Sequence, residues 1–209
     1  MGVITMAVTE PEIHPFHREP IESSDPNSEF AQERLSYPVS TLGTFEHKLF
    51  IDHVRRDTRS RLLIISPWVS GAVVTPRFID DLSRLARRGV LIRIGFGIDL
   101  ELSRERRDRE AERLLMNLNE RFENVVVGRL GNTHAKVLIS DYQMVISSFN
   151  WLSFRGDPRS TFRQEEGILT SIKPVIDSSF DKYSKQIHAV SSADRMSLQS
   201  EPRKVGSDD

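Results

Sequence analysis

Apolar residues recur along residues 41–190 in two alternating patterns, one with the helical period and one of short continuous runs. The helical period predicts amphipathic helices, and short apolar runs bounded by Gly, Pro or charged residues predict buried strands. The helices are expected over residues 44–57, 76–88, 104–121 and from Pro174 through Ile187. The strands are expected at Leu62–Ile65, Val90–Gly97, Val125–Val127 and Gly167–Ser171.

Local signals mark the ends of two of these helices. Thr75 is a favourable N-cap, Pro76 suits the first helical position, and Gly89 ends the same helix. Ser103 is the expected cap of the helix that follows.

Two short apolar runs, Val137–Ile139 and Met144–Ser147, flank the polar segment Ser140–Gln143. This pattern predicts a β-hairpin. Strands separated by helices pair in parallel, whereas a hairpin pairs antiparallel. The expected fold is therefore one α/β domain over residues 41–190, layered α-β-α around a mixed β-sheet.

The segments outside this domain differ from it in composition and charge. Residues 1–40 contain five prolines, have no apolar period and carry a net charge of −5, which predicts a disordered acidic leader. Residues 191–209 are expected to be a second disordered tail. The domain between them carries +5, within a chain total of −1. A basic body attracts polyanions such as nucleic acid, although so small an excess fits an ordinary solvated surface equally well.

The composition excludes several classes of protein. The chain has no cysteine, which excludes disulfides and thiolate metal sites and suits a cytoplasmic location. No apolar run reaches the length of a membrane span, so no membrane anchor is expected. The sequence also lacks the His and acidic spacings of metal motifs, and we expect no metal and no cofactor.

Polar side chains gather at one end of the predicted hairpin. His134 and Lys136 are two residues apart and share one face of an extended segment. Ser148 and Asn150 have the same spacing on the returning segment. If the hairpin pairs, these four groups converge at the edge of a buried sheet, and their cations and donors suit a phosphate.

This constellation resembles the HKD motif of the phospholipase D superfamily, H-x-K-x4-D-x6-G-S-x-N. His134, Lys136 and Asp141 match at the motif's spacing, and Ser148 and Asn150 match its end. The chain departs from the motif in having five residues after Asp141 and Ser147 in place of Gly. The resemblance implies a layered phospholipase D-like domain and a phosphodiesterase site.

The resemblance also implies roles for these residues. His134 would attack phosphorus to form a phosphohistidine, since neutral imidazole is available as a nucleophile near neutral pH. Lys136 would bind the phosphate oxygens, and Ser148 and Asn150 would donate hydrogen bonds to them.

Two acidic positions complete the predicted catalytic set. Asp141, in the turn, is expected to brace and orient rather than transfer a proton. Glu165 matches the family's downstream acid and would hold the far nitrogen of His134, a role that its neighbour Glu166 could also take. The alternative is that both acids are simply exposed at the start of a strand.

The chain has one such motif, whereas the superfamily's site needs two. His47, His53 and His188 lie in helical contexts and are interpreted as surface or core residues. The resemblance implies a homodimer in which each His134 faces its symmetry mate.

The segment after Asn150 is the predicted substrate-binding rim. Arg155, Arg159 and Arg163 alternate there with aromatic residues and follow Trp151, a combination that suits a sugar-phosphate backbone with stacked bases. The alternative is that these aromatics pack into the core. Trp68, which ends an early strand, could equally lie on the rim or in the core.

The leading hypothesis is a metal-independent phosphodiesterase, specifically a nuclease with nucleic acid (DNA foremost) as its partner. Two alternatives remain open. The same chemistry could act on phospholipid as a hydrolase or transphosphatidylase, or the domain could be a non-catalytic phosphate- or DNA-binding module.

Overall fold

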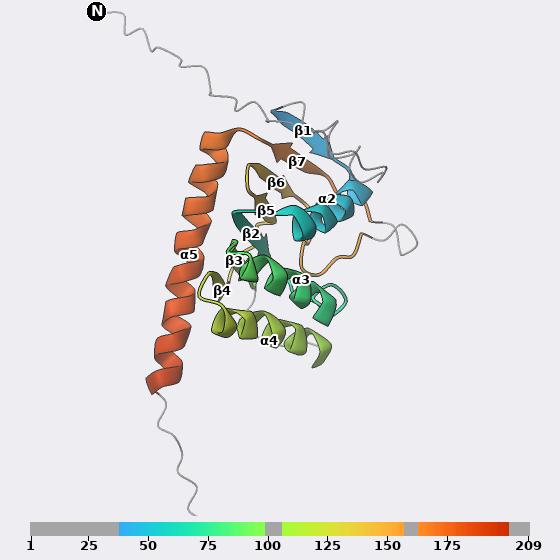
Figure 1. Ribbon diagram of the computed structural model, residues 1–209. Coiled ribbons are helices and arrows are strands. Elements are labelled where there is room, and N and C mark those ends of the chain that lie inside the picture. Colours follow the sequence, from blue (N-terminus) through green and yellow to red (C-terminus); the bar gives the residue numbers. More distant parts are fainter. Residues whose placement is uncertain (1–37, 99–105, 157–162, 201–209) are drawn as a thin grey trace, which may run out of the picture.

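The sheet at the centre of the computed structural model has seven strands in the order β1-β7-β6-β5-β2-β3-β4 (Figure 1). The structure describes residues 38–98, 106–156 and 163–200. The elements are β1 Val39–Leu42, α2 Thr44–Asp57, β2 Arg61–Ser66, α3 Pro76–Arg87, β3 Leu91–Phe96, α4 Arg106–Arg121, β4 Val125–Arg129, β5 Val137–Ser140, β6 Gln143–Ser147, β7 Gly167–Thr170 and α5 Lys173–Ser200.

The sheet is mixed, as the alternation of helices and hairpin predicts. β2, β3 and β4 are parallel and are connected through α3 and α4. β5 pairs antiparallel with β2 and β6, and β7 pairs antiparallel with β6 and β1. The α/β class and the mixed sheet are confirmed.

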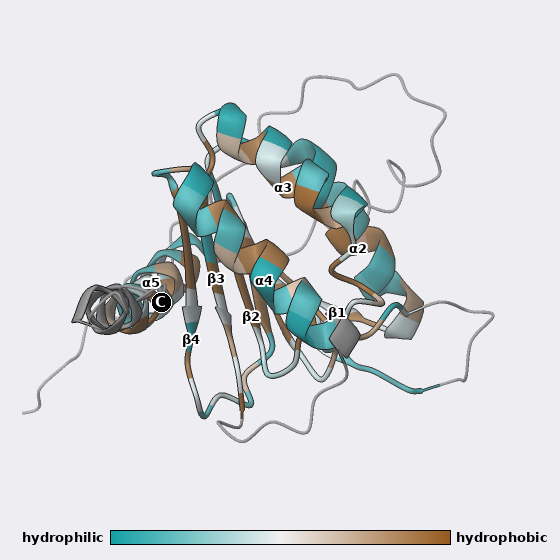
Figure 2. Cartoon of the chain, turned by 90° about the horizontal axis from the view of Figure 1, so that it is seen from below, coloured by the Kyte–Doolittle hydropathy of each residue, from teal (hydrophilic) through white to brown (hydrophobic). Residues whose placement is uncertain are grey.

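Alternate residues of the strands face two separate apolar cores. Leu62 and Ile64 of β2 pack with residues of α2, α3 and α4, whereas Leu63 and Ile65 pack on the other face with α5. Figure 2 shows α2, α3 and α4 on one side of the sheet and α5 nearly end-on at the other. The α-β-α layering is therefore confirmed.

The helix ends follow the predicted local signals. α2 spans the predicted residues 44–57. Thr75 Oγ1 accepts a hydrogen bond from Phe78 N at 3.3 Å and Pro76 is the first helical residue of α3. Gly89, just after the helix, has a φ of +86°, which glycine adopts without strain.

Three features differ from the sequence predictions or fall outside the structure. β1 lies partly within the expected leader and pairs at the edge of the sheet with β7, where a four-residue half-exposed strand leaves no apolar run to detect. α5 continues to Ser200, where a disordered tail was predicted, and residues 175–200 contain no Gly or Pro to end it. The predicted cap Ser103 lies outside the described residues, as do most of the leader and residues 201–209.

α5 is the longest described helix, yet its polar residues are spread along its length. Across the described part of the chain, no helix has both the length and the apolar character needed to traverse a bilayer.

Gly167 leaves room for its neighbours at the point where β7 begins. A Cβ added there would lie 2.7 Å from His47 Nε2 and 2.8 Å from the Cβ of Ser147, its register partner on β6. Ser147 stands where the resembling motif has Gly. The glycine at this level of the sheet is instead Gly167, on the opposite strand. Both approaches are closer than real Cβ contacts allow.

We predict that Gly167→Ala lowers the free energy of unfolding by about 1–3 kcal/mol, because overpacking displaces neighbours that are already in contact. Urea unfolding of the two proteins measures this loss. Adding Ser147→Gly should restore only part of it, because His47 still blocks the space. Unchanged stability in Gly167→Ala would contradict the close packing.

Candidate active site

His134 and Lys136 lie together just before β5, as their spacing predicts. Lys136 Nζ is 3.4 Å from His134 Nε2 and donates a hydrogen bond to the His134 carbonyl oxygen at 3.1 Å. His134 is exposed, whereas Lys136 is only 7% exposed. An ammonium and an imidazole nitrogen thus present adjacent polar atoms at the end of the sheet.

The surroundings of Lys136 act on its charge. Burial lowers the pKa of the Lys136 ammonium; the negative charge of Glu165 opposes this effect, and the positive charge of Arg163 adds to it. A buried cation with one nearby carboxylate is stabilised further when an anion binds beside it. The position therefore favours binding of a negatively charged group.

Ser148 and Glu165 form a second pair at the same end of the sheet. Ser148 Oγ donates a hydrogen bond to Glu165 Oε2, and Glu166 N donates to Ser148 Oγ at 3.1 Å. The backbone of the pair is anchored to α2, since Glu165 N donates to Thr44 Oγ1 at 2.9 Å. Thr44, the first residue of α2, was not predicted as part of the site.

Glu165 has a different partner from the one expected. Its side chain is 1% exposed, while His134 is exposed on the segment before β5, and no hydrogen bond between them occurs among the described residues. Glu165 instead orients Ser148 and lies 2.9 Å (Oε1) from Arg163 Nε. Glu166 is the exposed one of the two acids.

Asn150 lies three residues after the end of β6. Ser147 N donates to the Lys136 carbonyl oxygen at 3.2 Å, which aligns the residues after β6 with those before β5. The Asn150 side chain is 2% exposed, and its Oδ1 has no hydrogen-bond partner in the described structure. Buried amides normally have partners, so this carbonyl oxygen departs from the usual pattern.

Asp141 lies at the opposite end of β5 from His134, separated by about 13 Å of strand. Its φ is +50°, and its carboxylate accepts hydrogen bonds from the backbone N–H groups of residues 59, 60 and 61 at 2.8–3.1 Å. Asp141 is therefore not brought to His134 and Lys136. Its contacts brace the start of β2 against the hairpin turn.

The predicted substrate-binding residues divide between the site, the core and a separate cleft. Arg163 reaches the site through Glu165, and its guanidinium lies 5.8 Å from the centroid of the Phe154 ring. Arg155 instead donates to the Ala72 carbonyl oxygen and lines a cleft beside α2 and α3. Arg159 lies outside the described residues.

Trp151 is buried. Its side chain is 0% exposed and packs against Phe50, Phe149 and the His47 ring in the core beneath α2. The structure places Trp151 in the core rather than on the predicted rim, because its ring packs against α2.

Trp68 occupies the exposed position instead. It is 40% exposed, its ring centroid is 5.7 Å from that of His134 in an edge-on arrangement, and Lys136 Nζ is 6.0 Å from its ring. The sequence feature that could have indicated this position is that Trp68 follows β2, and β2 ends beside the start of β5.

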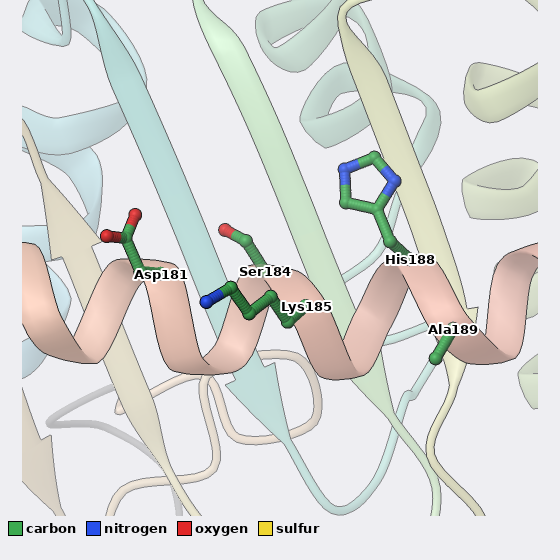
Figure 3. Close-up of a pocket in the computed structure, with 5 residues that line it drawn as sticks. All are labelled: Asp181, Ser184, Lys185, His188 and Ala189. Atoms are coloured by element: carbon green, nitrogen blue, oxygen red, sulfur yellow. The ribbon is translucent and has the colours of Figure 1, made fainter.

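Two hollows in the surface lie away from this cluster. One, of about 500 Å³, is lined by five residues of α5 alone (Figure 3). The other, of about 680 Å³, is the cleft that contains Arg155. Neither is lined by His134 or Lys136, so the candidate site is defined by its side-chain cluster. In the described part of the chain, no three His, Asp or Glu residues are grouped as metal ligands.

The comparisons with known proteins identify the fold. No protein-family model matches the chain. No curated protein matches it either. Among solved structures, Nuc from Salmonella typhimurium, a phospholipase D family member, matches with a TM-score of 0.53 and 15% identity, covering 73% of this chain and 95% of that chain.

Two further structures are similar. NucT from Helicobacter pylori has a TM-score of 0.51 at 15% identity, covering 72% of this chain and 95% of its own. TrmBL2, an archaeal chromatin protein with a described mode of DNA binding, has a TM-score of 0.51 at 13% identity. The match covers 78% of this chain and 60% of the TrmBL2 chain. The chain therefore has the phospholipase D-like α/β fold.

We predict that Asp141→Gly lowers the free energy of unfolding by about 2–3 kcal/mol, because three backbone N–H groups lose a charged acceptor while the positive φ remains unstrained. Asp141→Asn keeps one acceptor oxygen and should lose less. Thermal unfolding checks both variants. Full stability in Asp141→Gly would contradict the bracing role.

Proposed function

We propose that the protein is a metal-independent phosphodiesterase of the phospholipase D type that acts on nucleic acid. The observation that carries the proposal is the 3.4 Å approach of the Lys136 ammonium to Nε2 of the exposed His134. A phosphate held by Lys136 has its phosphorus next to a nucleophilic nitrogen. The Ser148–Glu165 pair and the buried Asn150 amide lie at the same end of the sheet and supply further polar groups.

In the proposed reaction, His134 Nε2 forms a bond to phosphorus as the bond from phosphorus to the leaving oxygen breaks. Lys136 stabilises the charge that builds on the non-bridging oxygens, while Glu165 holds the Ser148 hydroxyl in place. The leaving oxygen takes a proton from a second imidazole, a contribution of about 10²–10⁴-fold in rate. Water then gives a proton to that imidazole and displaces His134, so that both residues return to their initial states.

We propose that the second imidazole is His134 of the partner subunit in a two-fold symmetric homodimer. An exposed apolar patch beside the site supports this assembly. Ile146 and Ile168 are register partners on β6 and β7, about half exposed, and each lies within three residues of Ser148 or Glu165. Val39 on the neighbouring β1 is exposed to the same extent. A dimer whose contact includes this patch, which lies on the α5 face of the sheet, would bury its apolar side chains.

Nucleic acid is the favoured substrate because the domain carries a net charge of +5 and Arg163 lies at the site. The DNA-binding chromatin protein TrmBL2 has a similar fold, which is compatible with this assignment. The second candidate is a phospholipid substrate, which the exposed Trp68 favours as an interfacial anchor. Ser147 and the short hairpin leave a non-catalytic binding module as the third.

The first test is cleavage of circular single-stranded DNA in excess EDTA. We expect nicking to persist in the chelator, and His134→Asn to lower the rate about 10³-fold or more because the nucleophile is absent. Retention on DNA without cleavage would indicate the binding module, and head-group release from phosphatidylcholine vesicles would indicate lipid chemistry. Either outcome contradicts the nuclease proposal.

The second test is the oligomeric state by light scattering coupled to gel filtration. We expect a dimer, and Ile168→Asp should yield monomers with at least tenfold lower activity, because a charge on the patch opposes its burial. Leu91→Asp on β3 is a matched control, since Leu91 is also about half exposed. A monomeric wild-type protein would contradict the shared site.

A further inference from the structure

Trp68 is an exposed aromatic side chain on a fixed piece of backbone. Ser66 Oγ, fully buried, donates to the Trp68 carbonyl oxygen at 3.1 Å and accepts from Leu152 N at 3.3 Å. Gly97 N donates to the Pro67 carbonyl oxygen at 3.2 Å. Hydrogen bonds from the end of β3 and from the segment after Asn150 thus hold the loop on two sides. The loop is pre-organised, and only the indole ring extends into solvent.

The distance from the indole to the groups that would hold a phosphate is similar to the distance from base to phosphate within a nucleotide. Its ring centroid is 5.7 Å from that of His134, and Lys136 Nζ is 6.0 Å from it. In a nucleic acid, a flat base is joined to each phosphate through one sugar. A strand with its phosphate at Lys136 can therefore lay an adjacent base on Trp68.

We propose that Trp68 stacks an unpaired base next to the scissile phosphate, so that the substrate is single-stranded nucleic acid. This inference rests on the proposed function for the position of the phosphate. Base–aromatic stacking is insensitive to base identity, because every base has a π-face. Bases within a duplex are already stacked on one another and must be extruded before they can reach the ring.

The surroundings of Trp68 favour a nucleic-acid base over a lipid surface as its binding partner. The residues on either side of it, Pro67 and Val69, are buried, so the loop presents one indole rather than a continuous apolar face. Interfacial docking depends on a large apolar area inserted together. A base needs only one face of one ring, beside the cations that bind its phosphate.

Fluorescence tests this proposal because the chain has two tryptophans and Trp151 is fully buried. The full-length His134→Asn variant, which prevents turnover, is titrated with a single-stranded oligonucleotide, an abasic strand of equal length and a duplex. We expect the oligonucleotide to quench the emission, and the abasic strand and the duplex to leave it nearly unchanged. Trp68→Phe should remove the quenching and keep the affinity within about threefold.

Affinity gives the second readout. In the same background, Trp68→Ala should weaken binding of the single strand about tenfold or more, and leave binding of the abasic strand unchanged. Equal affinity of Trp68→Ala and its parent for the single strand overturns the inference, as does equal quenching by the abasic strand. A Trp68 emission shift with phosphatidylglycerol vesicles, and none with oligonucleotides, overturns it in favour of a lipid surface.

Failure of the inference and failure of the proposed function give different results. Cleavage of DNA without quenching or loss of affinity refutes stacking alone. The wild-type protein could instead show quenching and Trp68-dependent binding without cleaving DNA. That result refutes the proposed phosphodiesterase activity and leaves the stacking site in place.

Discussion

The ammonium of Lys136 is removed from water at the end of a buried strand, and much of the site follows from that constraint. Placing a charge in a poorly solvated position costs free energy unless opposite charge or hydrogen bonds offset the loss. Glu165 is the nearby carboxylate, but its own oxygens are directed to Ser148 and Arg163. The cation is therefore only partly compensated, and a bound phosphate would supply the rest.

The position of Glu165 depends in turn on a helix that is distant in the sequence. Thr44, the first residue of α2, accepts the Glu165 amide hydrogen across 121 residues of chain. The His47 ring, one turn later, lies against Phe149 and close to Gly167, which leaves no room for a side chain on the start of β7. α2 thus sets where β7 begins and, through it, where the Ser148–Glu165 pair lies.

Much of this arrangement could be predicted from the sequence because its signals are local. The period of residues 44–57, the Thr75–Pro76 cap and the hairpin at 137–147 each depend on neighbours within a few positions. The proximity of His134 and Lys136 likewise follows from a separation of two residues. The partner of Glu165 could not be predicted, because its choice between His134 and Ser148 depends on contacts with α2.

The two tryptophans show the same limit of prediction from local sequence. Each follows the end of a strand, and the sequence around each allows either the rim or the core. The structure buries Trp151 against α2 and exposes Trp68 on a loop held by its backbone. β1 also escaped prediction, because a short edge strand acquires its partner, β7, only when the last strand of the sheet is in place.

The position of β2 in the interior of the sheet has a consequence for synthesis on the ribosome. β2 is flanked by β3, which emerges soon after it, and by β5, which is made some seventy residues later. Until then, one side of the Leu62–Ile65 segment presents open backbone groups beside fully apolar side chains. Such an edge is prone to pairing with other chains. The nascent protein therefore passes through a stage at which the apolar β2 segment has an unpaired edge.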